Sequence, residues 1–337
     1  MAVTRYGVSR EELATVLAGE PGYRVDQVFD ALWRRRVPLE AATELPGALR
    51  DRLVERLPLA LTPLVEATAA DTMTTKWLWS AAGDSQIETV LMRSPRRASV
   101  CVSSQAGCAM ACTFCATGQA GFERHLSAAE IVEQVLRAQH TSPQRVTNVV
   151  YMGMGEPLAN YDPVWESVRT IHDRLDLSAR RITISTVGVV PGMRRLATEM
   201  LPVTLAVSLH APNDELRAKL VPLNHRYPIA EVLDAATEVA AARGRRVTFE
   251  YAGIRDVNDT ATHAESLGRL LNAWPGVGGA HVNLIPLNPT GGFPGRASSP
   301  ARLRDFARRL QARGVSATVR RPRGVDIDAA CGQLRRR

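Results

Sequence analysis

The sequence predicts an α/β protein, a partial (βα)6-type barrel preceded by a small helical domain. Beyond residue 101, short runs rich in β-branched residues alternate with helical patterns, which is typical of a parallel sheet. Before residue 72 the chain instead contains short helical patterns joined by turns. We therefore expect three parts: a helical N-terminal domain at 1–72, a β extension at 73–100, and a barrel core with its C-terminal segment at 101–337.

Three helical patterns make up the N-terminal part. Ser9 is placed to cap the first, residues 23–33 carry apolar side chains at helical spacing, and Pro46 opens the third. Three consecutive arginines, at 34–36, end the second pattern. At a helix C-terminus, arginines can interact favourably with the helix dipole and face solvent. Alternatively, they contact a polyanion such as RNA as part of an accessory domain.

The β extension contains three strand patterns, and the core contains six more. The first three lie at 76–80, 87–92 and 98–102, separated by turn signals. The later ones lie at 146–151, 181–185, 203–208, 247–251, 281–285 and 315–319. The clearest helical pattern between them begins where Ser127 and Glu130 form a capping box. Functional groups of such barrels gather at the carboxyl ends of the strands, so we expect the site there.

The composition narrows the location and the partners. The 337 residues include 42 Lys and Arg against 34 Asp and Glu, which gives a formal net charge of +8. A basic chain favours a polyanionic partner, although charge alone does not define a function. The sequence has no signal-peptide pattern and no run of about 18 apolar residues, so we expect a cytoplasmic protein without a membrane partner.

The five cysteines are the strongest chemical signal. An odd number of cysteines in a reducing compartment argues against a disulfide framework and for metal binding or catalysis. Cys108, Cys112 and Cys115 have a C-x3-C-x2-C spacing, which suits a tight loop around one [4Fe–4S] cluster. Because four thiolates are the usual ligand set, three would leave one iron open for a substrate or cofactor.

Zinc is the alternative metal, because Cys101 adds a fourth thiol seven residues before the triplet. Structural zinc sites, however, are usually built from two closely spaced pairs of ligands separated by a longer loop. The alternative function is a zinc-binding RNA-binding protein without catalysis.

Polar or glycine residues follow several of the predicted strands. Gly155 and Glu156 lie in a glycine-rich turn after the strand that ends at residue 151. Each such residue alone is more often part of a turn or cap, but their recurrence at strand ends favours a shared ligand site. The other positions are Ser185, Ser208, Leu209, His210 and Asn288.

The cysteine loop, with Phe114 and the Ala-Thr-Gly after Cys115, resembles the radical S-adenosylmethionine (SAM) enzymes. The resemblance implies that SAM chelates the open iron, and that one electron splits SAM into methionine and a 5′-deoxyadenosyl radical. Gly155 and Glu156 resemble the superfamily's Gly-Gly-Glu element, which receives the methionyl amine. The hydroxyl, imidazole and amide groups at the other strand ends suit the carboxylate, ribose and adenine of SAM.

Further segments narrow the resemblance to one family. Residues 101–112, 151–165, 184–192, 207–224 and 324–334 resemble the RlmN/Cfr family of RNA adenine methyltransferases. The likeness runs from about residue 23 to residue 334.

This resemblance implies roles for three more residues. Cys331 takes a methyl group from one SAM, and a second SAM provides the radical that activates this methyl group. Cys101 then resolves the RNA adduct by forming a transient disulfide with Cys331. Glu88 matches an acidic position that the family uses as a proton acceptor.

The implied reaction is methyl transfer to carbon 2 of an adenine in 23S rRNA near the peptidyl-transferase centre. This ring carbon is electron-poor and has no lone pair, so it cannot attack the SAM methyl directly and a radical route is required. An adenine in the tRNA anticodon loop is a second candidate substrate. The alternative reaction is Cfr-type methylation of carbon 8 of the same rRNA adenine, which gives antibiotic resistance. We expect a monomer that receives electrons from a flavodoxin or ferredoxin and extrudes the target base.

Overall fold

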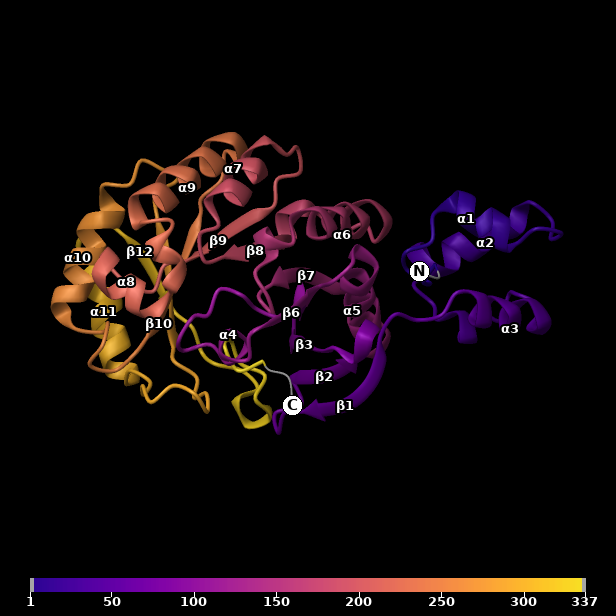
Figure 1. Cartoon of the computed structure of the whole chain (residues 1–337), viewed down its shortest axis with the longest axis horizontal. Helices are drawn as coiled ribbons and strands as arrows, with labels where there is room; N and C mark the ends of the chain where they lie inside the picture. The colour runs from indigo at the N-terminus through magenta and orange to yellow at the C-terminus, as the bar shows by residue number, and fades with distance from the viewer. Residues whose placement is uncertain (1–2, 335–337) are drawn as a thin grey trace.

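The computed structural model describes residues 3–334 of the chain. The predicted α/β architecture is confirmed: a ten-stranded sheet curls into a partial barrel that helices cover from outside (Figure 1). The strand order is β1-β2-β3-β4-β7-β8-β9-β10-β11-β12. A separate two-stranded hairpin, β5 (Gln105–Gly107) with β6 (Phe122–His125), flanks the cysteine loop.

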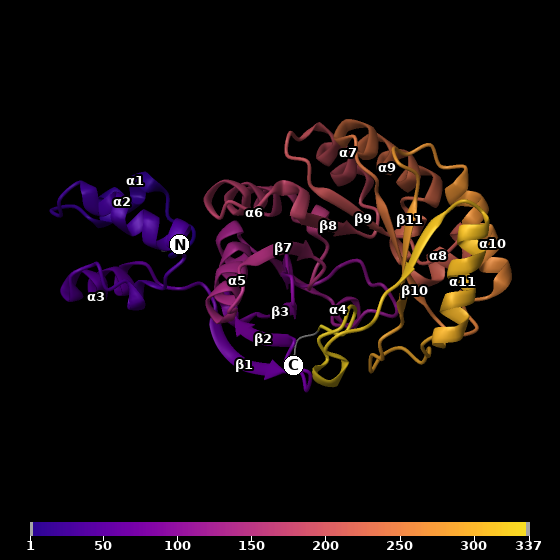
Figure 2. The ribbon, with the colours of Figure 1, turned by 180° about the vertical axis from the view of Figure 1, so that it is seen from behind.

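The N-terminal helices form a small unit at one side of the barrel (Figures 1 and 2). Ser9 caps the first helix in a capping box with Glu12, and the third helix follows Pro46, as predicted. The elements are α1 (Arg10–Val16), α2 (Tyr23–Asp30), the π-helical turn η1 (Ala31–Arg35), η2 (Leu39–Ala41) and α3 (Gly47–Arg56).

The three arginines at the end of η1 have different environments. Arg34 is exposed, and Arg35 pairs with acidic side chains of the helical unit itself. Arg36 adopts a left-handed conformation (φ 56°) and donates to the Leu175 carbonyl of the barrel at 2.6 Å. Arg36 therefore joins the helical unit to the barrel instead of facing solvent.

The sheet begins earlier in the chain than predicted, with β1 (Thr62–Thr68) inside the segment assigned to helices. Most β1 residues are exposed, so the strand lacks the alternation of buried and exposed side chains that marks a strand in sequence. It is held by antiparallel pairing with β2 (Thr74–Ser80) and by a 2.8 Å hydrogen bond from Trp77 Nε1 to Glu66. Tertiary pairing, not local propensity, determines this element.

The predicted strands are otherwise confirmed. β2, β3 (Gln86–Ser94) and β4 (Arg97–Cys101) form an antiparallel extension, and β4 then pairs in parallel with β7 (Val146–Tyr151). The six core strands differ from their predicted ends by at most two residues. After β7 they are β8 (Ile182–Thr186), β9 (Thr204–Ser208), β10 (Thr248–Gly253), β11 (His281–Pro286) and β12 (Ser316–Val319), each parallel to its neighbours.

Helices join successive strands and cover the outside of the barrel (Figure 2). They are α5 (Ala128–Thr141), α6 (Tyr161–Arg174), α7 (Val190–Thr198), α9 (Ile229–Arg243), α10 (Ala261–Asn272) and α11 (Pro300–Ala312). The capping box predicted for α5 is confirmed at Ser127 and Glu130. Loops carry the shorter elements η3 (Ala82–Asp84), α4 (Ala116–Gln119), η4 (Pro157–Ala159), η5 (Ala179–Arg181), α8 (Asp214–Leu220), η6 (Pro222–His225) and η7 (Val325–Ile327). Within residues 3–334, every helix falls short of the length and apolar character that a membrane crossing requires.

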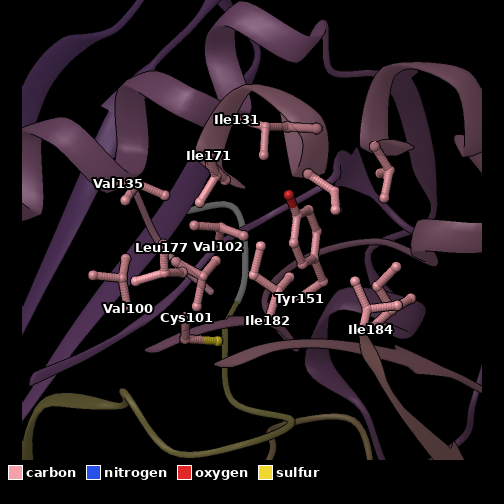
Figure 3. Close-up of a cluster of buried hydrophobic side chains, with 14 of the residues drawn as sticks. Val100, Cys101, Val102, Ile131, Val135, Tyr151, Ile171, Leu177, Ile182 and Ile184 are labelled. Atoms are coloured by element: carbon pink, nitrogen blue, oxygen red, sulfur yellow. The ribbon is translucent and has the colours of Figure 1, made fainter. Parts of the chain in front are cut away.

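The two faces of β4 have different surroundings. Val100 and Val102 belong to the apolar core beneath α5 and α6, together with Ile131 and Ile171 (Figure 3). The sulfur of Cys101, between the two valines, turns away from these side chains and towards the C-terminal segment (Figure 3). Successive side chains of a strand point to opposite faces, so packing of the valines presents Cys101 on the other face.

Candidate active site

The cysteine loop connects β5 to α4 and is held by backbone hydrogen bonds. The Cys115 N–H donates to the Cys112 carbonyl at 3.2 Å, which closes a tight turn. The Thr113 N–H donates to the Leu220 carbonyl at 3.1 Å, which ties the loop to α8. The loop that carries the three cysteines therefore has a defined path.

The sulfurs of this loop lie in an apolar setting. Cys108 and Cys112 are 9% and 7% exposed. Burial raises the pKa of Cys108 to about 12 and that of Cys112 well above its usual range. Such thiols stay protonated in the free protein, whereas coordination to a metal deprotonates a thiol. Cys112 packs in an apolar cluster with Phe114, Leu220, Val221, Ala252, Ile254 and Leu287.

The loop provides three thiols, which fit the ligand set of an iron–sulfur cluster. Within the described part of the chain, no three His, Cys, Asp or Glu side chains are grouped to hold one ion. A [4Fe–4S] cluster has a different requirement, because each thiolate binds a separate iron of the cube. Cys101, the fourth thiol of the zinc alternative, interacts with the charge on Cys331 and not with the loop cysteines.

Two glycines allow close packing around the loop. A Cβ on Gly118 would lie 2.9 Å from the Cys112 nitrogen, so glycine is needed for α4 to approach the loop this closely. Gly155 has a φ of +99°, which other residues rarely adopt, and a Cβ there would lie 2.6 Å from the Gln105 side chain. Gly155 therefore brings the turn after β7 against β5, next to the cysteine loop.

A cavity opens at the carboxyl ends of the parallel strands, where the sequence predicts the site. Cys112 and Cys115 line it from the cysteine loop, and Cys331 lines it from the C-terminal segment. The structure thus brings one end of the chain to a loop more than two hundred residues away in sequence. Most of the residues predicted to bind SAM also line this cavity: Gly155, Glu156, Ser185, Ser208, His210 and Asn288.

Glu156 is a buried carboxylate in the cavity wall, only 2% exposed. Its oxygens accept hydrogen bonds from the N–H groups of Leu158 at 3.0 Å and Val187 at 2.9 Å. Burial raises its pKa to about 7, although these hydrogen bonds act in the opposite direction. A cation in the cavity would favour the ionised carboxylate, so Glu156 suits an amine ligand.

His210 and Leu209 follow β9 and contribute in different ways. His210 has φ 60°, and its Nδ1 accepts the Ala252 N–H at 3.0 Å, so Nε2 carries the proton. Burial, with the nearby Arg217 charge, lowers the pKa of His210 to about 3, and the ring is neutral. Leu209 is fully buried outside the cavity lining, and its N–H donates to the Glu250 carbonyl at 3.0 Å.

The C-terminal segment packs against the cysteine loop. The Ala116 N–H, immediately after Cys115, donates to the Gly332 carbonyl at 2.8 Å. Asn288, after β11, donates through Nδ2 to the Cys331 carbonyl at 2.9 Å. These contacts with the carbonyls of Cys331 and Gly332 hold the Cys331 side chain at the cavity.

Cys331 and Cys101 are free thiols whose charges interact. Cys331 is exposed to solvent through the cavity, yet the surrounding protein still desolvates it. This desolvation, followed by the Glu250 charge, raises the pKa of the Cys331 thiol. Cys101 is 7% exposed, and burial followed by the charge on Cys331 raises the pKa of its thiol.

Glu88 lies on β3, outside the cavity lining. It is 1% exposed, and its Oε1 pairs with Lys76 Nζ at 2.9 Å. Lys76 also donates to the Asp328 carbonyl at 3.1 Å, which links this pair to the C-terminal segment. Val90 pairs with Cys101 across the ladder, so Glu88, two residues away on β3, shares a face with Cys101. Glu88 is therefore a buried, ion-paired group, unlike the solvated glutamate usual on an exposed strand.

Three charged residues of this region were not singled out from the sequence. Glu250 of β10 lines the cavity, accepts Asn283 Nδ2 at 2.8 Å, and has a pKa raised by burial. The sequence feature that could have indicated Glu250 is a charged residue inside an otherwise apolar strand. Arg217 and Lys76 are also buried, but each stands among polar residues and gave no comparable signal.

Known proteins share both the sequence and the fold. The sequence pattern of the Radical SAM superfamily matches residues 102–265. A "Probable dual-specificity RNA methyltransferase RlmN" from Parafrankia sp. is 52% identical over 346 residues, covering 96% of this chain and 89% of the relative. A protein of the same name from Salinispora tropica is 53% identical over 339 residues, covering 96% and 90%. The chain belongs to the RlmN family.

The RlmN family relationship extends to three dimensions. A crystal structure of a radical SAM methyltransferase from Sphaerobacter thermophilus aligns with a TM-score of 0.92 and 48% identity, covering 99% of each chain. Membership of the radical SAM superfamily implies a [4Fe–4S] cluster and SAM. The desolvated cysteine loop fits the cluster, and the adjoining cavity with its buried carboxylate fits SAM.

Proposed function

We propose that this protein is a SAM-dependent RNA methyltransferase that methylates carbon 2 of an adenine in 23S rRNA near the peptidyl-transferase centre. The observation that carries the proposal is the position of Cys331 in one cavity with Cys112 and Cys115. A methyl donor bound there would meet the thiol that accepts the methyl group. The names of the relatives support RNA as the substrate, and their dual specificity supports a tRNA adenine as a second one.

In this proposal, Cys108, Cys112 and Cys115 hold the cluster, and the strand ends hold SAM. With SAM bound, the reduced cluster supplies a radical that can remove hydrogen from a methyl group. Glu156 is suited to the methionyl amine because its buried carboxylate becomes ionised beside a cation. The remaining SAM-binding groups are Gly155, Ser185, Ser208, Leu209, His210 and Asn288, of which Leu209 contributes through its backbone.

Cys331 is the methyl carrier. Its thiol loses a proton, and its sulfur takes the methyl group of one SAM to give S-methylcysteine, with S-adenosylhomocysteine as the leaving group. Only the thiolate is a good nucleophile, and the raised pKa of this thiol keeps the free protein largely unreactive near neutral pH. The open cavity then allows the methyl group to face both a second SAM and the RNA base.

Cys101 resolves the adduct that follows. Once the S-methyl group has lost a hydrogen atom, its carbon bonds to adenine carbon 2. The adduct then loses the ring proton, for which Glu88 is the proposed acceptor, and one electron, which the oxidised cluster would accept. Cys101 attacks the Cys331 sulfur, so that the S–S bond forms as the S–C bond to the base breaks, and the released carbon takes a proton to complete the methyl group. The effect of Cys331 on the pKa of Cys101 supports their approach to the required distance of about 2 Å.

The N-terminal part is proposed to grip RNA. In this division, residues 1–72 are the accessory domain, 73–100 lead into the core, and 101–337 form the catalytic core. The exposed Arg34 and the net charge of +8 support contact with phosphates. The base must leave the RNA fold to reach the cavity. A monomer in the cytoplasm, reduced by a flavodoxin or ferredoxin, completes the proposal.

Mass spectrometry of nucleosides tests the reaction directly. Anaerobically reconstituted full-length protein would be incubated with SAM, a reductant, and 23S rRNA or tRNA lacking the modification. We expect 2-methyladenosine in the digested RNA. Finding only 8-methyladenosine would replace the proposed carbon, and finding no methylated adenosine would refute the activity. A colourless protein with stoichiometric zinc would instead support the non-catalytic alternative.

A further inference from the structure

Arg217 of α8 is a buried guanidinium that donates hydrogen bonds to residues lining the cavity. Its residue exposure is 0%, and its hydrogen bonds all go to neutral oxygens. Nε donates to the Leu209 carbonyl at 3.1 Å, and one terminal nitrogen donates to Asn224 Oδ1 at 2.9 Å. The other terminal nitrogen donates to the carbonyls of Val187 at 2.6 Å and Ser208 at 3.3 Å.

These acceptors belong to two adjacent strand ends. Val187 follows β8, and Ser208 and Leu209 lie at the end of β9. Val187 is held from both sides, because its N–H donates to Glu156 Oε2 at 2.9 Å while its carbonyl accepts from Arg217. One guanidinium therefore sets the relative position of three groups around the cavity: the turn after β8, the end of β9, and the carboxylate of Glu156.

The charge of Arg217 lies close to the cysteine loop. The helix that carries it ends at Leu220, whose carbonyl accepts the Thr113 N–H of that loop at 3.1 Å. Leu220 also packs in the same apolar cluster as Cys112 and Phe114. Burial lowers the pKa of Arg217 to about 10, and interactions with Cys112 and Asp214 act against this effect.

A buried cation whose hydrogen bonds all go to neutral groups is destabilising unless an anion approaches it. A cluster held by Cys108, Cys112 and Cys115 would bring thiolates towards this side of the guanidinium. A bound cluster would therefore add to the negative charge around Arg217, to which Asp214 already contributes.

We propose that Arg217 is a positioning residue with two effects: it fixes the strand ends that bind SAM, and its charge favours electron uptake by the cluster. This inference rests on the cluster and SAM positions in the proposed function. Electron uptake makes the cluster more negative, so a fixed cation nearby stabilises the reduced form. The planar fork of arginine reaches several carbonyls at once, which the point charge of lysine does not reproduce.

Two substitutions separate these effects. Arg217→Gln removes the charge and most of the fork, whereas Arg217→Lys keeps the charge and loses the fork. The midpoint potential of the cluster would be measured by redox titration with electron paramagnetic resonance, and the Kd for SAM by equilibrium binding. For Arg217→Gln we expect about tenfold weaker electron uptake, a shift of about 59 mV to more negative potential for a one-electron couple. For Arg217→Lys we expect an almost unchanged potential with about tenfold weaker SAM binding.

Arg5 provides a matched control. It is 2% exposed, but it lies in the helical unit and pairs with Glu40 at 2.8 Å. Arg5→Gln should alter neither the cluster potential nor the Kd for SAM. An unchanged potential in folded Arg217→Gln would overturn the electrostatic effect, and unaltered SAM binding in Arg217→Lys would overturn the positioning effect.

A folding failure leaves the inference testable. If Arg217→Gln does not fold, the midpoint potential of the cluster would be measured in Arg217→Met, which fills the space of the side chain without a charge. Asn224→Ala, which keeps the guanidinium but removes one acceptor, tests positioning: weaker SAM binding at constant potential supports it, and unchanged binding counts against it. Absence of any cluster signal in the unaltered protein would refute the proposed function itself, which is a distinguishable result.

Discussion

Buried charged side chains have different hydrogen-bond partners in the helical unit and at the rim of the barrel. In the helical unit, Arg5 meets the carboxylate of Glu40 through two hydrogen bonds of 3.0 and 2.8 Å. At the carboxyl ends of the barrel strands, Arg217 donates only to neutral oxygens, and Glu156 accepts hydrogen bonds from the N–H groups of Leu158 and Val187. The buried Arg5 thus pairs with an opposite charge, whereas the hydrogen-bond partners of Arg217 and Glu156 are neutral.

This difference distinguishes buried charges that stabilise the fold from buried charges that serve ligand binding. An isolated buried charge destabilises a fold, so such groups persist where a ligand or cofactor completes them. Glu156 and Arg217 have opposite charges: the carboxylate is suited to an amine, and the guanidinium is suited to thiolates. The buried charges at the rim of the barrel are therefore suited to bound groups, whereas the buried charge of Arg5 in the helical unit is balanced within the chain.

The largest expected effect comes from removing the methyl carrier. Cys331→Ala should lower RNA methylation by at least about 10³-fold, because the other thiols that line the cavity, Cys112 and Cys115, are assigned to the cluster. Iron and sulfide content should stay unchanged, since Cys331 is outside the cysteine loop. Nucleoside mass spectrometry and metal analysis measure the two quantities. Retained activity with an unmodified residue 331 would be incompatible with the carrier role.

The next effect concerns the uncompensated carboxylate at the rim. Burial raises the pKa of Glu156 to about 7 from 4.5, so between these pH values the folded protein holds a proton that the unfolded chain has released. The contribution of Glu156 to stability therefore falls as pH rises from about 4.5 to 7 and remains low above it.

Glu156→Gln should remove this dependence. In cluster-free protein, the free energy of unfolding of the variant relative to the unaltered protein should rise between pH 5 and pH 8, by up to about 3 kcal/mol. Urea unfolding at both pH values measures the change. An equal difference at pH 5 and pH 8 would contradict a raised pKa. The same variant should bind SAM at least about tenfold more weakly, because the amine loses its carboxylate partner.

Removing the paired ion Arg5 of the helical unit should lower stability without changing SAM binding. Arg5→Gln breaks the pair with Glu40 and the 3.2 Å hydrogen bond to the Leu57 carbonyl. Because Glu40 is about half exposed and can be rehydrated, we expect a loss of about 2 kcal/mol of unfolding free energy. Thermal and urea unfolding measure it. A change in SAM affinity of similar size would show that the two regions are not independent.

The smallest effect is expected at the first helix. Ser9→Ala removes the cap that accepts the Glu12 N–H at 3.1 Å, at a cost of about 1 kcal/mol. Ser9→Asp, which retains an acceptor oxygen, should restore most of the stability. Methylation of naked RNA at saturating concentration should be equal in all three proteins. Loss of activity without loss of stability would show that this helix acts in RNA binding beyond its structural role.

Local patterns were sufficient for much of the fold. The capping boxes at Ser9 and Ser127 and the core strands were readable because backbone capping and β-branched runs act within a few residues. The strand β1 was not readable, since it is exposed and depends on its pairing with β2. The π-helical end of the second helix was also missed, because the contact of Arg36 with the barrel lies far away in sequence.

The sequence by its local spacing determined which residues carry chemistry: a cysteine triplet that one loop can bring together, two further cysteines, and polar groups after strands. Tertiary structure alone decided that Cys331 shares a cavity with the loop and that Glu88 is buried against Lys76. It also decided that Arg217 joins two strand ends. The physical reason is range: motifs depend on covalent neighbours, whereas burial and the balance of charge depend on what the fold brings into contact.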